Sequence, residues 1–218
     1  MLSTVISNTR VSRHTFVLKV ERPNTDIRAG QCFNIGLAHS SVNREYSMYS
    51  DAHADFIEFL IREVDDGVVS PQLAAAKTGD HINLFGPYGD FCIDRVFKSS
   101  APADERRYLF IGTGTGIAPF RSYIKTFTIP NYLILHGTRE ADENYGAPDY
   151  CTDKYRACIS NSEVGRPGFR VTDALKDENI SYPDIVFICG NRKMIADVYD
   201  ILRAMNISSD NIFTEAFF

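Results

Sequence analysis

Polar and apolar residues alternate in short runs up to about residue 90, and Gly, Pro, Asn and Asp separate these runs. Short alternating runs at this spacing predict antiparallel strands closed into a barrel. One helix is expected among them over residues 71–76, with Ser70 as its N-cap and Pro71 at its first position. The expected strands cover residues 14–21, 31–37, 46–49, 55–64 and 81–85.

The pattern changes after residues 96–107, a small, polar, proline-containing segment that is typical of a linker. Beyond it, apolar runs alternate with helical patterns, which predicts a parallel α/β sheet. We therefore expect two domains, at residues 1–100 and 101–218. In the second domain the expected strands cover residues 108–111, 132–136, 155–160, 185–189 and 211–217, and the expected helices cover residues 117–127, 171–177 and 194–205.

Composition excludes several classes of function. A net charge of −5 gives no support for nonspecific nucleic-acid binding, which requires Lys and Arg to neutralise phosphates. No apolar run approaches the ~20 residues of a membrane span, and the N-terminus lacks the pattern of a signal peptide. The 5 cysteines are widely spaced without Cys-x-x-Cys, so we expect no metal site and a reduced, cytoplasmic chain.

A glycine-rich turn joins the apolar strand at residues 108–111 to the helix that follows. This arrangement aims backbone N–H groups and a helix N-terminus at a phosphate, and glycine lets a pyrophosphate approach the backbone. The spacing fits neither G-x-G-x-x-G nor a Walker P-loop. A tight turn without a ligand is the alternative. The candidate phosphate-binding residues are Gly112, Thr113, Gly114, Thr115 and Gly116.

Two stretches of the first domain carry further candidates. In Arg44-Glu-Tyr-Ser47, Arg44 and Tyr46 share one face of a strand, where arginine can bind a pyrophosphate and tyrosine can stack on a flat ring. The alternative is an ordinary edge strand. A glycine turn that enters a capped helix offers backbone donors to a second phosphate, although it is equally typical of a well-capped helix. That turn contains Gly67, Val68, Val69 and Ser70.

In the second domain, Arg139 follows a strand at the carboxyl edge of the sheet, where open α/β sheets bind ligands. An NAD site usually places an acidic residue there for the ribose diol. Arg139, together with Arg170, suits a 2′-phosphate better. Each arginine could equally be a solvated surface charge, and Cys189 could be a small packing residue.

Taken in order, these motifs resemble the ferredoxin–NADP⁺ reductase superfamily over nearly the whole chain. Arg44-x-Tyr46-Ser47 is similar to its flavin motif, Gly67-x-x-Ser70 to its flavin-pyrophosphate motif and Gly112–Pro119 to its nicotinamide-dinucleotide loop. The resemblance implies an FAD-binding β-barrel followed by an NADP-binding α/β domain. Two further segments are similar to the family segments that flank the nicotinamide. They are Cys189-Gly190-Asn191 and the terminal Glu215-Ala-Phe217.

The resemblance also implies a role for each matching residue. Arg44 would hold the FAD pyrophosphate, Tyr46 would stack on the isoalloxazine and Ser47 would hydrogen-bond at flavin N5. Cys189 would lie beside nicotinamide C4, and Glu215 would be the active-site carboxylate. Ser47, Cys189 and Glu215 are therefore the expected catalytic residues.

The chain departs from the family pattern at two places. Phe217 stands where members often have tyrosine or tryptophan over the other flavin face, and Phe218 beyond it is expected to share or take over this cover. In many members the residue after Ser160 is an arginine that binds the 2′-phosphate, whereas Asn161 stands here.

The segment Gly86–Gly89 resembles reductases of aromatic-ring oxygenases, many of which prefer NADH. Those reductases usually carry a fused iron–sulfur domain, and this chain has no cysteine pattern to hold one, so a stand-alone two-domain form is expected. We expect an enzyme that transfers a hydride from NADPH to FAD, with NADH as an alternative donor. It then passes electrons one at a time to a ferredoxin or flavodoxin. Alternatives are an NAD(P)H–flavin reductase, an NADH-dependent reductase component of an oxygenase system, and a non-catalytic electron-transfer subunit.

Overall fold

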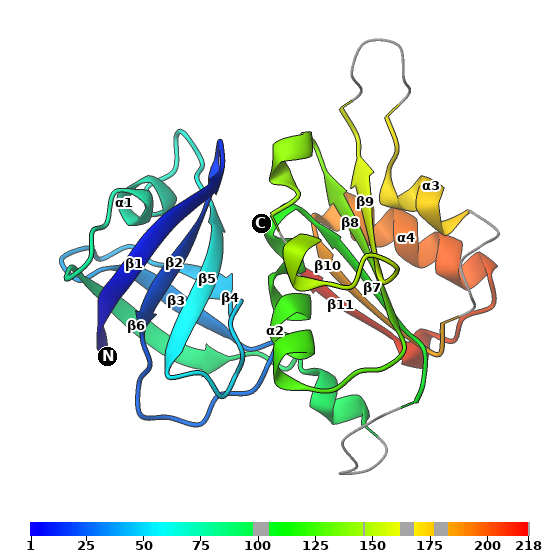
Figure 1. The fold of residues 1–218 in the computed structure, drawn as a ribbon, viewed down its shortest axis with the longest axis horizontal. Coiled ribbons are helices and arrows are strands. Elements are labelled where there is room, and N and C mark those ends of the chain that lie inside the picture. The colour runs from blue at the N-terminus through cyan, green and yellow to red at the C-terminus, as the bar shows by residue number, and fades with distance from the viewer. Residues whose placement is uncertain (98–104, 146, 162–167, 177–182, 218) are drawn as a thin grey trace. The chain divides into compact units, whose positions relative to one another are not determined.

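The computed structural model describes residues 1–97, 105–145, 147–161, 168–176 and 183–217. The chain forms two compact units (Figure 1). Unit 1 comprises Met1–Lys98 with Ala118–Thr128, and unit 2 comprises Ser99–Ile117 with Ile129–Phe218. The domain boundary expected between residues 100 and 101 lies outside the described residues. No helix among the described residues is both long and apolar enough to cross a membrane.

Unit 1 is built on a six-stranded antiparallel sheet in the order β4-β3-β6-β1-β2-β5. A bridge between Met48 and Phe59 and a 2.8 Å hydrogen bond from the Tyr49 N–H to the Glu58 carbonyl join the end of β4 to β5. This pairing closes the sheet, so the predicted barrel is confirmed. The strands are β1 (Leu2–Ser12), β2 (Thr15–Glu21), β3 (Cys32–Leu37), β4 (Arg44–Ser47), β5 (Phe56–Arg62) and β6 (His81–Tyr88).

Alternate residues of these strands fill the barrel interior. On β2, Phe16, Leu18 and Val20 are buried while the residues between them are partly exposed. The Phe33 and Phe59 rings meet edge to face with their centroids 5.9 Å apart. The period of two that predicted the strands is therefore the period with which side chains enter the core.

Strand β1 was absent from the sequence prediction. Its register against β2 shifts between Val5 and Ser7 and again between Arg10 and Ser12. Each shift places two residues of one strand opposite one of the other, so alternation fails along Leu2–Ser12. The strand at residues 81–85 likewise continues to Tyr88, beyond the turn expected at Gly86.

The short helix α1 (Ser70–Ala74) corrects the prediction for Ser70. The N-cap is Val69, which makes no side-chain cap, and Ser70 is the first helical residue. The Ser70 Oγ instead accepts a 3.0 Å hydrogen bond from the Val64 N–H, because the preceding turn brings that backbone group alongside. The helix ends at Ala74, two residues before the expected end at Ala76.

Helix α2 (Ala118–Thr126) follows the glycine turn in sequence but packs within unit 1. Nη1 of Arg121 donates to the Tyr49 carbonyl at 2.9 Å and to Oε2 of Glu58 at 3.1 Å. The Tyr123 hydroxyl donates to the Phe91 carbonyl. These mostly buried contacts hold the helix against the barrel, and removing one partner of the ion pair would leave a buried charge.

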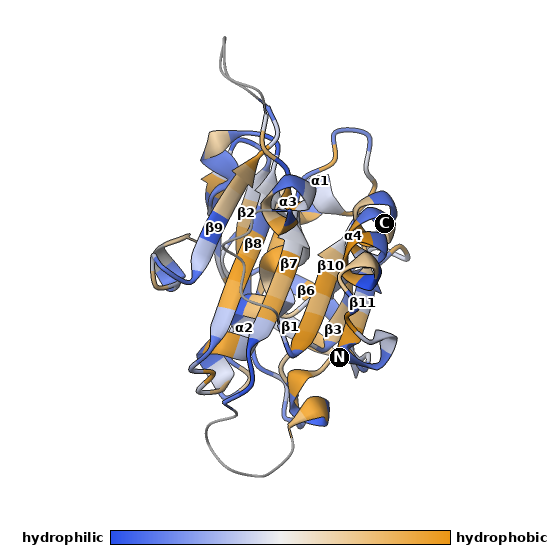
Figure 2. Cartoon of the chain, turned by 90° about the vertical axis from the view of Figure 1, so that its right-hand side faces the viewer, coloured by the Kyte–Doolittle hydropathy of each residue, from blue (hydrophilic) through white to orange (hydrophobic). Residues whose placement is uncertain are grey.

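Unit 2 is a parallel five-stranded sheet in the order β11-β10-β7-β8-β9, as predicted. Figure 2 shows its strands β7 and β10 as hydrophobic along most of their length, which is typical of parallel strands covered on both faces. The predicted ends of these elements agree with the structure to within about two residues. The elements are β7 (Tyr108–Thr113), β8 (Tyr132–Thr138), β9 (Tyr155–Ile159), α3 (Val171–Leu175), β10 (Ile185–Gly190), α4 (Arg192–Ala204) and β11 (Ile212–Ala216).

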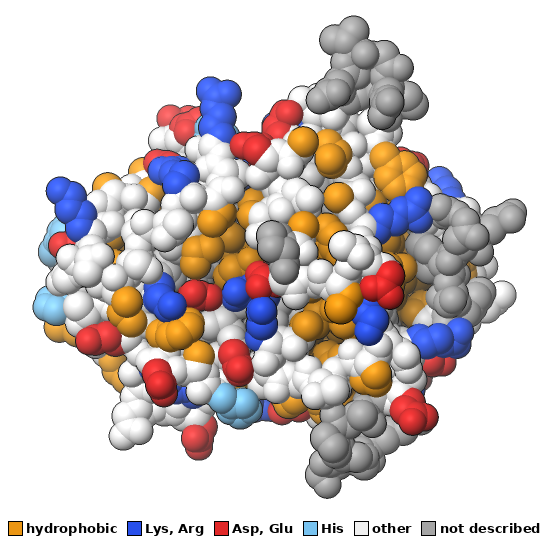
Figure 3. All heavy atoms as spheres, viewed as in Figure 1, with side chains coloured by type: hydrophobic (Ala, Val, Ile, Leu, Met, Phe, Trp, Pro, Cys, Tyr) orange, Lys and Arg blue, Asp and Glu red, His pale blue; other side chains and the backbone are white. Residues whose placement is uncertain are grey.

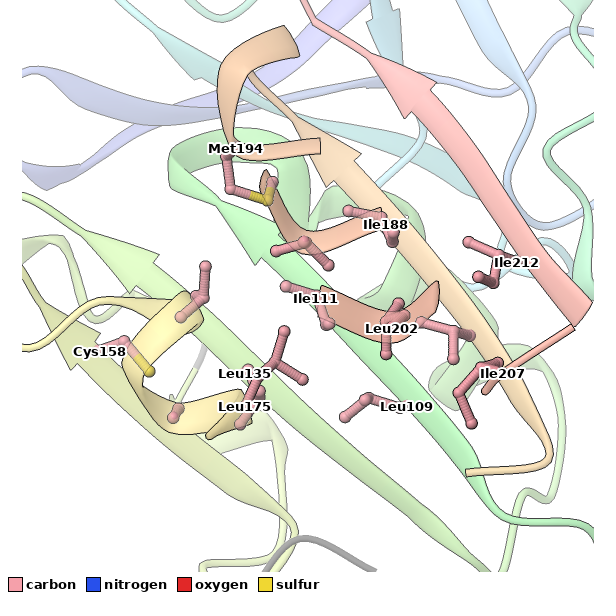
Figure 4. Packing of buried hydrophobic residues seen from close by; sticks show 14 residues of the cluster. Leu109, Ile111, Leu135, Cys158, Leu175, Ile188, Met194, Leu202, Ile207 and Ile212 are labelled. Atoms are coloured by element: carbon pink, nitrogen blue, oxygen red, sulfur yellow. The ribbon is translucent and has the colours of Figure 1, made fainter. Parts of the chain in front are cut away.

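One core cluster of unit 2 lies where α3 and α4 pack on the sheet (Figure 4). It joins strand residues such as Ile111 and Ile188 to helix residues such as Leu175 and Leu202, all almost fully buried. The rigid core fixes where each parallel strand ends. Because those ends meet at one edge of the sheet, the residues after each strand are brought together there.

Candidate cofactor and hydride-transfer sites

Strand β4 carries the three flavin candidates of unit 1. Arg44 is exposed, Tyr46 is half-buried and Ser47 is buried. Burial raises the pKa of Tyr46 to about 12, and the nearby Arg44 lowers it by a smaller amount. The Tyr46 phenol is therefore neutral at physiological pH and available to stack, while the Arg44 guanidinium is accessible to an anion.

The turn before α1 is suited to a phosphate group. The Gly67 N–H donates to the Val64 carbonyl at 2.8 Å, which closes the turn. In the described part of the chain, the N–H groups of Val68, Val69 and Ser70 have no hydrogen-bond acceptor. A Cβ at Gly67 would lie 2.9 Å from the Val64 carbonyl oxygen, so glycine is required for this close turn.

The glycine turn of unit 2 packs directly on the end of β10. A Cβ at Gly116 would lie 2.8 Å from the carbonyl carbon of Cys189, and it would clash with the carbonyl oxygen. Gly190 has φ +143°, and a Cβ there would meet Oγ1 of Thr113. The turn and the strand end thus fit together only because both contain glycine. Gly114, with φ +55°, lies in the left-handed region that favours glycine.

Cys189 and Glu215 are neighbours across β10 and β11. The Cys189 thiol is fully buried, and burial, followed by the charge of Glu215, raises its pKa well above the ordinary value. The thiol therefore stays protonated and does not act as a thiolate nucleophile. Beyond β11, the Phe217 N–H donates to the Gly190 carbonyl at 2.8 Å. Phe218 lies outside the described residues.

Asn191 has a structural role of its own. It is the N-cap of α4, and its Oδ1 accepts a 2.8 Å hydrogen bond from the Met194 N–H. Its N–H donates to Oγ1 of Thr113 at 3.4 Å, which adds a second link between the strand end and the glycine turn.

Both candidate arginines lie near the carboxyl end of β9 and are exposed. The Arg139 carbonyl accepts from the Asn161 N–H at 2.9 Å, and Arg170 directly follows Phe169, whose N–H donates to the Ile159 carbonyl at 2.9 Å. The Ser160 hydroxyl is engaged, since Oγ donates to the Thr138 carbonyl at 3.1 Å.

Acidic residues also follow β8, directly after the arginine on which the expectation of NADPH rests. Oε1 of Glu140 accepts from Nδ2 of Asn161 at 2.6 Å. The buried Glu143 carboxylate accepts from the N–H groups of Arg139 and Glu140 at 2.9 and 3.1 Å. Glu143 thus shapes the loop, while Glu140 stays at the edge of the sheet.

Sequence reasoning assigned no role to His136, which is fully buried on β8. Its Nε2 lies 2.9 Å from the Gly114 carbonyl oxygen, so it contacts the glycine turn directly. The sequence does contain a signal for this contact, because His136 is a polar residue within an otherwise apolar parallel strand. A buried imidazole needs a polar partner, so such a residue is expected to form a hydrogen bond.

Charges on the surface are mixed. On the face that Figure 3 shows, Lys and Arg side chains are interspersed with Asp and Glu side chains. This face therefore does not present one sign of charge to a partner.

Comparison with known proteins agrees with both units. The family model of the oxidoreductase FAD-binding domain matches residues 3–93. The chain is 28% identical to the toluate 1,2-dioxygenase electron transfer component of Pseudomonas putida, over 97% of this chain and 66% of that protein. It is also 28% identical to the flavodoxin/ferredoxin–NADP reductase of Escherichia coli strain K12, over 84% of this chain and 81% of that protein. The chain is therefore similar to ferredoxin–NADP⁺ reductases, and residues 3–93 match an oxidoreductase FAD-binding domain.

A solved member of the superfamily shares the fold of the whole chain. The ferredoxin NADP⁺ reductase from Neisseria gonorrhoeae, solved with bound FAD and NADP, matches with a TM-score of 0.83 at 20% identity, covering 100% of this chain and 98% of that one. This likeness confirms the predicted two-part fold, and the matched family model is that of an oxidoreductase FAD-binding domain. The chain nevertheless spans only 66% of the Pseudomonas putida relative.

The roles of single residues remain predictions. The structure groups Arg44, Tyr46 and Ser47 on β4 within unit 1, with Gly67–Ser70 elsewhere in the same unit. Within unit 2 it brings the glycine turn together with the Cys189–Asn191 strand end.

Proposed function

We propose that this chain catalyses hydride transfer from a nicotinamide dinucleotide to FAD and then passes single electrons to a separate carrier. The observation that carries the proposal is the glycine turn packed against Cys189 and Gly190 at the carboxyl edge of the parallel sheet. It occurs in a chain whose residues 3–93 match an FAD-binding domain. FAD, when bound, supplies the redox chemistry, and the protein supplies binding and orientation.

In unit 1 the residues fit a flavin dinucleotide. Arg44 would neutralise the pyrophosphate with its exposed guanidinium, and the unpaired N–H groups of Val68–Ser70 would donate to the same group. Tyr46, a neutral phenol, would orient the flavin ring by stacking. The buried Ser47 hydroxyl would hydrogen-bond the ring at N5.

In unit 2 the residues fit a nicotinamide dinucleotide. The turn Gly112–Gly116 would bind the pyrophosphate, and Cys189 with Glu215 would flank the nicotinamide. The exposed Arg139 and Arg170 near the end of β9 support NADPH as donor. Glu140, held by Asn161, supports NADH as the alternative, since a carboxylate suits a ribose diol.

The electron acceptor is proposed to be a ferredoxin or flavodoxin-like carrier in the cytoplasm. The Escherichia coli relative is a flavodoxin/ferredoxin–NADP reductase, which supports such a carrier. None of the five cysteines, all of which the structure describes, forms a disulfide, in keeping with a reducing compartment. The second candidate is the reductase component of an oxygenase, which the Pseudomonas putida relative favours.

Carrier-dependent electron transfer tests this function. Purified holoprotein and NADPH are mixed with cytochrome c, with and without added ferredoxin or flavodoxin. Reduction of cytochrome c that depends on the carrier supports the proposal. Release of reduced flavin into the filtrate would instead indicate a flavin reductase, and no NAD(P)H oxidation with any acceptor would indicate a non-catalytic subunit.

A further inference from the structure

His136 is a buried ionisable side chain to which the proposed reaction assigns no step. It lies on β8 with Gly112 of β7 and Ala157 of β9 as its neighbours in register. The side chain is 0% exposed. Its Nε2 lies 2.9 Å from the Gly114 carbonyl oxygen, and its Nδ1 lies 2.7 Å from the Tyr155 hydroxyl oxygen. One imidazole therefore links the glycine turn to β9.

The geometry fixes which nitrogen carries the proton. A carbonyl oxygen can only accept, so Nε2 must be protonated and donate to Gly114. Burial lowers the pKa of His136 to about 4, despite smaller opposing effects of the Gly114 hydrogen bond and of Glu143. The ring is therefore neutral at pH 7 and holds only this one proton. The Tyr155 hydroxyl donates to Oδ1 of Asn144 at 2.5 Å, and its oxygen lies 2.7 Å from Nδ1 of His136.

This hydrogen bond acts on the first residue of the short 3₁₀ helix Gly114–Ile117. Gly114 has φ +55°, a conformation that glycine adopts without steric cost. In a planar trans peptide the C=O and the following N–H point in opposite directions. A Gly114 carbonyl held against His136 therefore directs the Thr115 N–H away from His136.

We propose that His136 is a positioning residue for the nicotinamide dinucleotide. Its Nε2–H holds the Gly114 carbonyl, and the Thr115 N–H is thereby presented to a phosphate of the dinucleotide. This inference rests on the proposed function, in which Gly112–Gly116 binds the pyrophosphate. In this role His136 contacts neither the dinucleotide nor the flavin, and it acts only by orienting the Gly114–Thr115 peptide.

Three variants separate this role from packing. His136→Gln keeps an amide N–H at about the reach of Nε2, whereas His136→Asn reaches about as far as Nδ1 and cannot contact Gly114. Tyr155→Phe removes the hydroxyl beside Nδ1, together with its hydrogen bond to Asn144, and leaves the Nε2 contact with Gly114 in place. We expect His136→Asn to raise the Kd for NADP⁺ about tenfold, the effect of one hydrogen bond of ordinary strength. The other two should stay within about threefold of wild type.

The measurement is calorimetric titration of each holoprotein with NADP⁺ and NAD⁺, together with FAD content and the flavin reduction rate at saturating NAD(P)H. A raised Kd and KM with unchanged FAD content and unchanged saturated rate supports the positioning role. Equal losses in His136→Asn and His136→Gln, or no loss in either, would overturn it. A wild-type protein that binds neither nucleotide would reject the proposed function itself.

A second measurement covers the case in which His136→Asn does not fold. Wild-type protein labelled with ¹⁵N reports the tautomer of His136 and the shift of the Thr115 amide by NMR. The inference requires a ring protonated at Nε2 at pH 7 and a Thr115 amide that shifts on addition of NADP⁺. A ring protonated at Nδ1, or an unaffected Thr115 amide, would contradict it.

Discussion

Acidification is expected to destabilise unit 2 through His136. The pKa of this residue is about 4 in the folded protein and 6.5 when unperturbed, because folding removes the ring from water. The unfolded chain therefore takes up the proton first as the pH falls. The stabilisation is fully present above pH 6.5 and is lost as the pH falls towards about 4. Since one pKa unit corresponds to about 1.4 kcal/mol, the complete loss is about 3 kcal/mol.

His136→Gln is the control for this measurement, because it keeps the other groups that face His136. Tyr155, Tyr145 and Glu143 surround the ring, and they are retained in His136→Gln. The free energy of urea unfolding is measured by far-UV circular dichroism between pH 8 and pH 4.5 for both proteins. Wild type should lose about 2–3 kcal/mol more than His136→Gln over this range. Parallel pH profiles would refute the buried neutral imidazole.

Four further predictions concern the candidate sites. Arg44→Ala should weaken FAD binding by about 1.5–3 kcal/mol through loss of a charge-assisted contact; full flavin retention after gel filtration would reject that assignment. Arg139→Ala should raise the KM for NADPH and leave NADH nearly unaffected, and equal losses with both nucleotides would contradict a 2′-phosphate contact. Ser47→Ala and Cys189→Ala should slow flavin reduction in stopped flow more than they weaken binding; wild-type rates with a raised KM would argue against both. Truncation before Phe217 should tighten NADP⁺ binding and produce a long-wavelength charge-transfer band, and unchanged affinity without that band would mean that the chain end is a packed strand.

Unit 2 could be predicted closely because its elements have local signals. The apolar run at residues 108–111, the glycines after it and the helical spacing beyond them specify strand, turn and helix without long-range information. The glycines lie in the turn between strand and helix, and the structure shows a steric reason for them that the sequence does not carry. Gly116 must be glycine because Cys189 packs against it, and that contact joins residues far apart in sequence.

The features that the sequence analysis did not predict depend on interactions that do not change the periodicity of the sequence. The shifts of register in Leu2–Ser12 hid a strand that pairs with two others. Residue type predicts Ser70 as an N-cap, yet its hydroxyl accepts a hydrogen bond from the Val64 N–H. His136 lies inside an apolar strand, and its partners are Tyr155 on the neighbouring strand β9 and Gly114 in the turn after β7.

The central claim is that this chain passes a hydride from NAD(P)H to bound FAD. Anaerobic titration of the purified protein with NADPH and NADH in parallel tests it most directly, with the flavin visible spectrum as readout. The account predicts a yellow protein that is bleached by one equivalent of nucleotide per FAD, with NADPH more effective than NADH. A colourless protein, or a bound flavin that neither nucleotide reduces, would contradict it.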